Sequence, residues 1–88
     1  MGKVDCFYIE GIDCWFYSQE HEPVHFHAKR SGEWEVKVNF LEQKGRMIER
    51  VGGSGRMSRA QRKILCETAE QYREILLKEW EKKVLCDA

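Results

Sequence analysis

The chain has 88 residues, enough for one small domain with a thin hydrophobic core. Its 15 basic and 15 acidic residues balance, which argues against nucleic-acid binding through overall charge. No apolar run approaches the roughly 20 residues that span a bilayer, and residues 1–5 lack the apolar core of a secretory signal. We therefore expect a single cytoplasmic domain, residues 1–88, with no membrane contact.

The first half of the chain predicts two β-hairpins. Residues 4–9 and 12–17 are rich in β-branched and aromatic side chains, and Glu10-Gly11 between them is typical of a two-residue turn. In that register Ile9 faces Ile12 and Phe7 faces Cys14. One face of this hairpin lies away from the expected helix, so a protein partner or a second copy of the chain could cover it, as in a homodimer. That aromatic face comprises Val4, Cys6, Tyr8, Trp15 and Tyr17.

The second hairpin contains a His-x-His sequence. Alternation along residues 24–29 and 34–40 places His25 and His27 on one polar face, away from the apolar side chains. A three-residue loop, Arg30-Ser31-Gly32, joins the two strands, with its glycine in the left-handed conformation. In this register Glu35 lies opposite His27, and Lys37 lies opposite His25.

The second half of the chain predicts a helix. Residues 42–51 are ambiguous, and a short fifth strand through Met47 and Ile48 is one interpretation. Residues 52–57 form a Gly-rich loop. Ser58 and Gln61 fit a capping box, and apolar residues recur at three- and four-residue steps beyond it, so a helix should span about residues 58–85. The expected fold class is α+β: a four- to five-stranded mostly antiparallel sheet over about residues 3–51, with one long C-terminal helix packed on one face.

Four cysteines, at positions 6, 14, 66 and 86, form no C-x-x-C pair, which argues against zinc fingers and thioredoxin-like chemistry. We expect reduced thiols that act as small core residues. Cys6 and Cys14 would lie on opposite faces of the first hairpin, so a disulfide between them is not expected.

The histidine pair has three interpretations. A two-residue step on a strand places His25 and His27 on one side, about 7 Å apart at the backbone. They could be structural residues on a solvated face, contacts to nucleic acid or phosphate, or ligands of a transition metal together with Glu22. If the protein is an enzyme, which the sequence leaves open, the two histidines would be the catalytic acid and base on a phosphodiester, with Arg56 or Lys37 stabilising charge.

A local excess of positive charge lies in the middle of the chain. Residues 44–63 carry 7 basic and 1 acidic side chains, net +6, whereas residues 1–43 are net −4 and residues 64–88 net −2. Arg56, Arg59 and Arg62 flank the expected helix start, where anions are favoured, and the nearby glycines could let the backbone approach a phosphate. The alternative is a surface loop with solvated arginines. The G-x-x-x-x-G-K-[ST] spacing of a Walker sequence is absent.

Two segments carry a family resemblance. Phe16-Tyr17-Ser18 with Glu20 and residues 22–28, which read E-P-V-H-F-H-A, resemble the F-Y-S…E-P-x-H-x-H-V signature of small bacterial proteins called domain of unknown function 4160. The run of residues 73–77 followed by Trp80 is similar to that family's R-E-x-L-L-x-x-W ending. Val24, Ala28 and the Gly-rich segment depart from the usual pattern. The resemblance implies a small intracellular α+β domain without an established activity, and its members look like parts of toxin–antitoxin modules.

We therefore expect a binding or regulatory module, with a toxin–antitoxin component as its specific interpretation, and without a cofactor. It would contact nucleic acid or a phosphate-bearing ligand through the histidine face and the basic patch. One alternative is a metal-binding protein or metal-dependent hydrolase that holds a divalent transition metal. Another is a purely structural domain that binds a partner. The residues proposed for ligand contact are His25, His27, Glu35, Lys37, Arg56, Arg59 and Arg62, and those proposed for the metal are Glu22, His25 and His27.

Overall fold

The computed structural model describes residues 2–17, 24–53 and 55–85. Five antiparallel strands form one sheet in the order β1-β2-β3-β4-β5, so each strand pairs with its neighbours in the sequence. The predicted α+β class and antiparallel sheet are confirmed. The strands are β1 (Gly2–Lys3), β2 (Asp13–Phe16), β3 (Phe26–Arg30), β4 (Trp34–Val38) and β5 (Ile48–Gly52), and a short helix α1 (Lys44–Met47) precedes β5.

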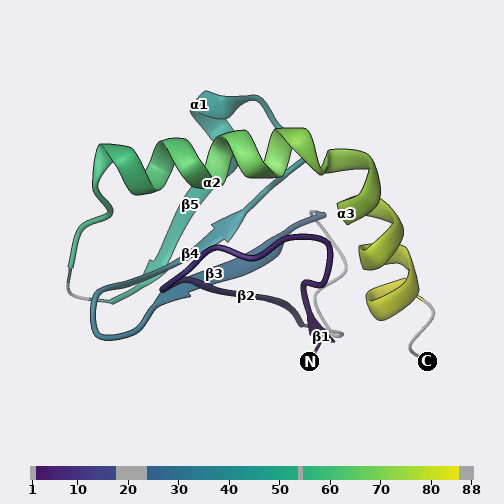
Figure 1. The fold of residues 1–88 in the computed structure, drawn as a ribbon, viewed down its shortest axis with the longest axis horizontal. Coiled ribbons are helices and arrows are strands. Elements are labelled where there is room, and N and C mark those ends of the chain that lie inside the picture. The colour runs from purple at the N-terminus through teal and green to yellow at the C-terminus, as the bar shows by residue number, and fades with distance from the viewer. Residues whose placement is uncertain (1, 18–23, 54, 86–88) are drawn as a thin grey trace.

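The C-terminal part of the chain is helical but is not one helix. Helix α2 (Arg59–Gln71) lies across one face of the sheet, and α3 (Arg73–Trp80) turns away from it toward the end of the molecule where both termini lie (Figure 1). A π-helical turn, η1 (Glu81–Leu85), follows. The predicted long C-terminal helical segment is confirmed, with one interruption: the backbone leaves the helical region at Tyr72, with φ −103° and ψ 16°. The predicted capping box of Ser58 and Gln61 is confirmed.

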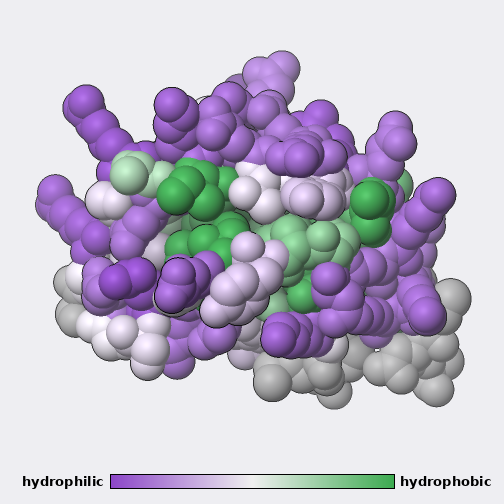
Figure 2. All heavy atoms as spheres, viewed as in Figure 1, coloured by the Kyte–Doolittle hydropathy of each residue, from purple (hydrophilic) through white to green (hydrophobic). Residues whose placement is uncertain are grey.

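The hydrophobic core lies between the sheet and these helices. Strand residues alternate, so every second side chain of β3 and β4 faces α2. Figure 2 shows hydrophobic residues gathered in the crease between α2 and the chain below it, with hydrophilic residues over the outer side of the helix. Each large apolar side chain buried there contributes roughly 1.5–3 kcal/mol. The large buried side chains include Phe16, Phe26, Trp34, Val38, Phe40, Met47, Leu65 and Leu76.

The first hairpin differs from the prediction. Ile9 does face Ile12, in an isolated bridge, but the strands then pair Lys3 with Trp15 rather than Cys6 with Trp15. The intervening residues leave the sheet, and Phe7 packs its ring 5.7 Å from both Phe26 and Tyr72. Phe7 is thus partly buried against the core instead of pairing in a regular hairpin. The aromatic face predicted for this hairpin therefore does not form: Val4 enters the core, and Tyr8 stands exposed.

The second hairpin has the predicted faces in a shifted register. The loop is residues 31–33 rather than 30–32, so Arg30 pairs with Trp34 and His27 pairs with Lys37. Gly32 has the expected positive φ, 79°. Because the shift is two residues, each side chain stays on its predicted face while its partner changes.

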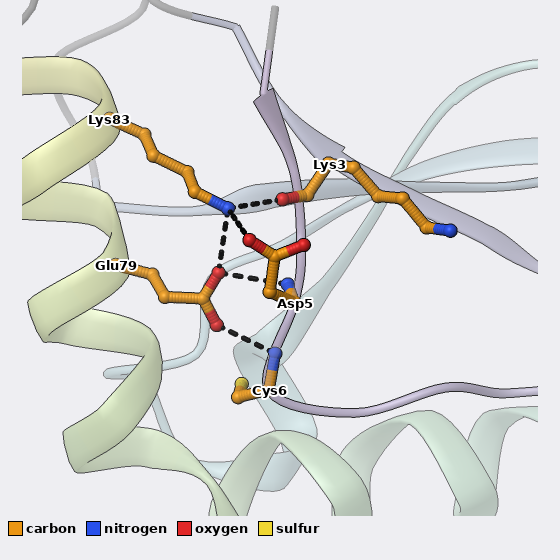
Figure 3. Close-up of polar contacts among 5 residues, drawn as sticks. All are labelled: Lys3, Asp5, Cys6, Glu79 and Lys83. Atoms are coloured by element: carbon orange, nitrogen blue, oxygen red, sulfur yellow. Dashed lines mark hydrogen bonds and ion pairs between the residues drawn. The ribbon is translucent and has the colours of Figure 1, made fainter.

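Residues far apart in the sequence are joined near the termini. Lys83 donates to the carbonyl of Lys3 at 2.5 Å and to the carboxylates of Asp5 and Glu79 at 2.6 and 3.0 Å (Figure 3). Glu79 in turn accepts the backbone N–H groups of Asp5 and Cys6. These contacts fix the N-terminal segment against α3. In the part of the chain described here, no helix is long and apolar enough to cross a membrane.

Candidate functional site

The histidine pair lies on the sheet face opposite α2, but it is not solvated. His25 is 3% exposed and His27 is 2% exposed. Trp15, which pairs with His27 across the strands, stacks on its imidazole with ring centroids 5.5 Å apart. Tyr17 meets the same imidazole edge-on at 4.5 Å, and the two imidazoles lie 5.0 Å apart. The predicted solvated face is therefore corrected: both rings are buried, and Trp15, Tyr17 and His25 pack around His27.

The charged residues predicted beside the histidines are present in a different arrangement. Lys37, rather than Glu35, pairs with His27 across the strands. Glu35 nevertheless reaches His27 diagonally, with its Oε2 3.7 Å from Nδ1. A carboxylate at that distance can orient the imidazole ring. The prediction that Glu35 and His27 are in contact is confirmed, although the register behind it was wrong.

A metal centre at this face has incomplete support. Two of the three proposed ligands, His25 and His27, come together, whereas Glu22 lies outside the described residues. Within residues 2–17, 24–53 and 55–85, no three His, Cys, Asp or Glu side chains are arranged to hold a metal ion. The arrangement of described residues fits a packed aromatic cluster, and metal binding stays a prediction.

The predicted arginines line two recesses around the start of α2. The first is an open groove of about 320 Å³ between α2 and the β4–β5 edge of the sheet. Its rim carries Arg50, Arg56 and Arg62, and its other lining residues, Trp34, Val36, Ile48 and Met57, are apolar. We call it the arginine groove. The second recess, also about 320 Å³, lies beside α1 and is lined by Lys44, Gly45, Arg59, Arg62, Lys63 and Cys66.

The cations around α2 are mostly unpaired. Lys44 lies 3.5 Å from Glu70, and one N–H of Arg50 donates to the carbonyl of Gly53. Among the described residues, Arg56, Arg59 and Arg62 form no ion pair. These three guanidinium groups are therefore available to an anionic ligand.

The glycines before α2 have a structural explanation. Gly53 has φ 92°, and a Cβ there would lie 2.5 Å from Trp34 Cα. The N–H of Gly55 donates to the Glu33 carbonyl at 2.5 Å. The segment is thus held against the start of β4, and these glycines permit close approach to protein backbone rather than to phosphate. This packing places Arg56 at the groove.

The structure separates the histidines from the arginines. One row across the sheet runs Trp15, His27, Lys37 and Glu49, and the neighbouring row runs Cys14, Ala28, Val36 and Arg50. Adjacent rows point to opposite faces, so the histidine row faces away from α2 and Arg50 faces toward it. Arg56 therefore cannot stabilise charge at the histidines, and the single composite site expected from the sequence is corrected to two surfaces.

Several cations that line the two recesses were not predicted as site residues. Arg50 lies in β5 within a segment whose structure was ambiguous in the sequence, and Lys44 and Lys63 reach the second recess from α1 and α2. The available signal was the net charge of residues 44–63, which predicted a basic patch without assigning its members.

The thiols of the described cysteines are not arranged as nucleophiles. Cys6, Cys14 and Cys66 are free, which agrees with the expected reduced state. Burial raises the pKa of the Cys14 thiol to about 12. Burial, together with a hydrogen bond to Glu79, raises the pKa of Cys6 to about 12 as well. Such thiols are almost entirely protonated at neutral pH and are poor nucleophiles.

Comparison with known proteins gives one match. The model of the family DUF4160, described as a domain of unknown function, matches residues 11–81. No curated protein and no solved structure shows significant similarity to the chain. Within the matched range, Arg73 donates to the carbonyl of Phe40 at 2.8 Å, and Trp80 is buried, so these two residues of the C-terminal motif hold the fold together.

Proposed function

This chain belongs to the DUF4160 family, and from its own surfaces we propose that it is a small cytoplasmic binding module that contacts nucleic acid through the phosphate backbone. The contact surface is the one that surrounds the start of α2, which we call the basic surface. Its cations are Lys44, Arg50, Arg56, Arg59, Arg62 and Lys63.

One observation carries the proposal: Arg62 lines both recesses. It therefore joins Arg50 and Arg56 of the arginine groove to Arg59 and Lys63 of the second recess, so the basic side chains form one continuous surface. Phosphate groups along a nucleic-acid strand are spaced regularly, so a continuous row of cations gains more from them than isolated cations do. Arginine also binds phosphate with two parallel hydrogen bonds.

The histidine pair supports a structural role better than a catalytic one. Both imidazoles are buried, with Trp15 and Tyr17 against that of His27, on the face away from the basic surface. A phosphodiester held at the arginines would not reach them. Catalysis by His25 and His27, metal binding, and membership of a toxin–antitoxin pair stay predictions, as does a purely structural role with a protein partner.

Salt dependence of binding tests the proposal. Fluorescence anisotropy of labelled single-stranded RNA and double-stranded DNA would be measured from low to physiological salt. We expect log affinity to fall linearly with log salt, and the triple substitution R56Q/R59Q/R62Q to weaken binding at least about tenfold and to lower the slope by about 2–3.

The triple substitution K29Q/K78Q/K82Q is the matched control. It removes the same charge from exposed lysines outside the basic surface, and we expect affinity within about twofold of wild type because its sites make no phosphate contact. A flat salt response, or equal losses in the two triple variants, would contradict the proposal.

A further inference from the structure

The arginine groove has a composition that contact with the phosphate backbone of a nucleic acid does not by itself explain. Three guanidinium groups surround a floor of apolar side chains, and none of the described residues that line it is acidic. Its volume of about 320 Å³ lies at the lower end of the roughly 300–1,000 Å³ typical of small-molecule sites. A ligand that fills it must present both an anion and an apolar body.

A nucleoside phosphate meets both requirements. Its phosphate can accept two parallel hydrogen bonds from an arginine guanidinium. Its base can stack on a guanidinium plane and cover apolar surface, as bases do in single-stranded recognition. Building on the proposed function, we infer that the arginine groove binds one nucleoside phosphate, with the phosphate at Arg56 and Arg62 and the base over Ile48 and Met57.

The groove is fixed before any ligand arrives. The indole N–H of Trp34 donates to Gln61 Oε1 at 3.2 Å, which ties the floor of the groove to α2. The guanidinium of Arg50 donates to Gly53, and Gly55 is bonded to the start of β4. The Arg50 side chain is therefore held by neighbouring backbone, so binding at Arg50 costs less side-chain entropy than at a flexible surface arginine.

The nucleoside phosphate in the groove could come from two sources: a free nucleotide, or one unpaired nucleotide within a single strand. NMR titration of labelled wild-type protein with the four ribonucleoside 5′-monophosphates tests binding of a free nucleotide, with adenosine and inorganic phosphate as comparisons. Titration with a short single-stranded oligonucleotide tests binding of a nucleotide within a strand. We expect saturable shifts at residues 48–53 and 55–62, and at least about tenfold tighter binding of a monophosphate than of adenosine or phosphate.

Two double substitutions with equal charge change separate the groove from the wider surface. R50Q/R56Q removes two cations of the groove, whereas R59Q/K63Q removes two from the second recess only. We expect the first to weaken monophosphate binding at least about tenfold and the second by less than about twofold. M57Q keeps the side-chain length and should weaken the monophosphate severalfold while leaving inorganic phosphate unchanged.

Each remaining outcome decides a different point. Equal losses in the two double variants, or oligonucleotide binding without saturable monophosphate binding, would overturn the groove inference and leave the proposed function standing. Monophosphate binding without oligonucleotide binding would support the groove with a free nucleotide as its source and overturn the proposed function. An oligonucleotide that binds more tightly than a monophosphate, and competes with it, would support the single-strand source.

Discussion

Glu79 and Cys6 are joined across 73 residues of sequence: the backbone N–H of Cys6 donates to Glu79 Oε2 at 2.9 Å. The other carboxylate oxygen accepts the N–H of Asp5 at 2.8 Å. Because residues 5–8 leave the sheet, these two donors have no strand partner, and Glu79 supplies the acceptors that a ladder would have provided.

Replacing Glu79 with alanine should therefore destabilise the protein. The substitution leaves the Cys6 N–H, which is partly buried, without its acceptor, and also removes a partner of Lys83. A loss of about 1–3 kcal/mol in the free energy of unfolding is expected, measured by urea denaturation. Glu74→Ala, at an exposed position of the same helix, is the control and should change it by less than about 0.5 kcal/mol. Similar effects of the two substitutions would show that Glu79 does not anchor the N-terminal segment.

The same carboxylate should make stability depend on acid pH. Burial alone would raise the pKa of Glu79, but hydrogen bonds from the Cys6 thiol, the Asp5 N–H and Lys83 outweigh it and lower the pKa below 4.5. A lowered pKa in the folded state means that the unfolded chain binds more protons, so the contribution is present above pH 4.5 and is lost as pH falls through the lowered value. Glu79→Gln should flatten the loss of unfolding free energy below that pH. An unchanged pH profile in this variant would contradict the assignment.

Gly53 should not tolerate alanine. Its φ of 92° is strained for any other residue, and a Cβ would lie 2.5 Å from Trp34 Cα and 2.6 Å from the Glu33 carbonyl oxygen. We expect Gly53→Ala to lower the unfolding free energy by about 2 kcal/mol or more and to weaken ligand binding at the arginine groove. Gly45→Ala is the control, since a Cβ there meets nothing within 4 Å and alanine favours the helix α1. Equal thermal stabilities of the two variants would show that the Gly53 segment is not held against β4.

The sequence predicted the faces of the second hairpin because side-chain alternation has a period of two. A register error of two residues moved the partner of His27 from Glu35 to Lys37 without moving any side chain to the other face. The class of fold followed from the same alternation and from the three- and four-residue periodicity of the helical segment. Both periodicities depend only on residues close in sequence, so the faces and the fold class inferred from them stay correct when the strand pairing is wrong.

The burial of the histidines was not predictable from local pattern. It depends on Trp15 and Tyr17, whose position beside β3 is set by the pairing of β2 with β3. The regular hairpin expected for residues 4–17 assigned those two side chains to a separate aromatic face. The arginine groove was missed for a similar reason, since Arg50 and Arg56 meet only when β5 forms and Gly53 and Gly55 pack against Glu33 and Trp34.

The thiols should react slowly in the folded protein. Raising the pKa of Cys6 and Cys14 from 9.0 to about 12 lowers the thiolate fraction near pH 8 by about a thousandfold. Alkylation by iodoacetamide, followed by peptide mass spectrometry, should label these two positions far more slowly in native than in denaturing buffer. Rates within tenfold of each other in the two buffers would contradict the buried environment.

His27 should contribute to stability rather than to ligand binding. Its ring is 2% exposed and contacts Trp15, Tyr17 and His25, so His27→Ala removes a buried aromatic group and leaves a cavity. We expect a loss of about 2–4 kcal/mol in unfolding free energy, measured by urea denaturation. Lys29→Ala, on the same strand and face but exposed, should change it by less than about 0.5 kcal/mol.

Ligand binding provides the second readout for His27. At a temperature where His27→Ala remains folded, its affinity for nucleotide and oligonucleotide should match that of wild type, because the histidine row and the arginine groove occupy opposite faces of the sheet. A selective loss of affinity with preserved stability would place His27 in a binding site instead. Metal analysis of untagged wild-type protein completes the test: a stoichiometric transition metal that disappears in His27→Ala would establish the metal alternative, since imidazole is the ligand such metals prefer at a site of this kind.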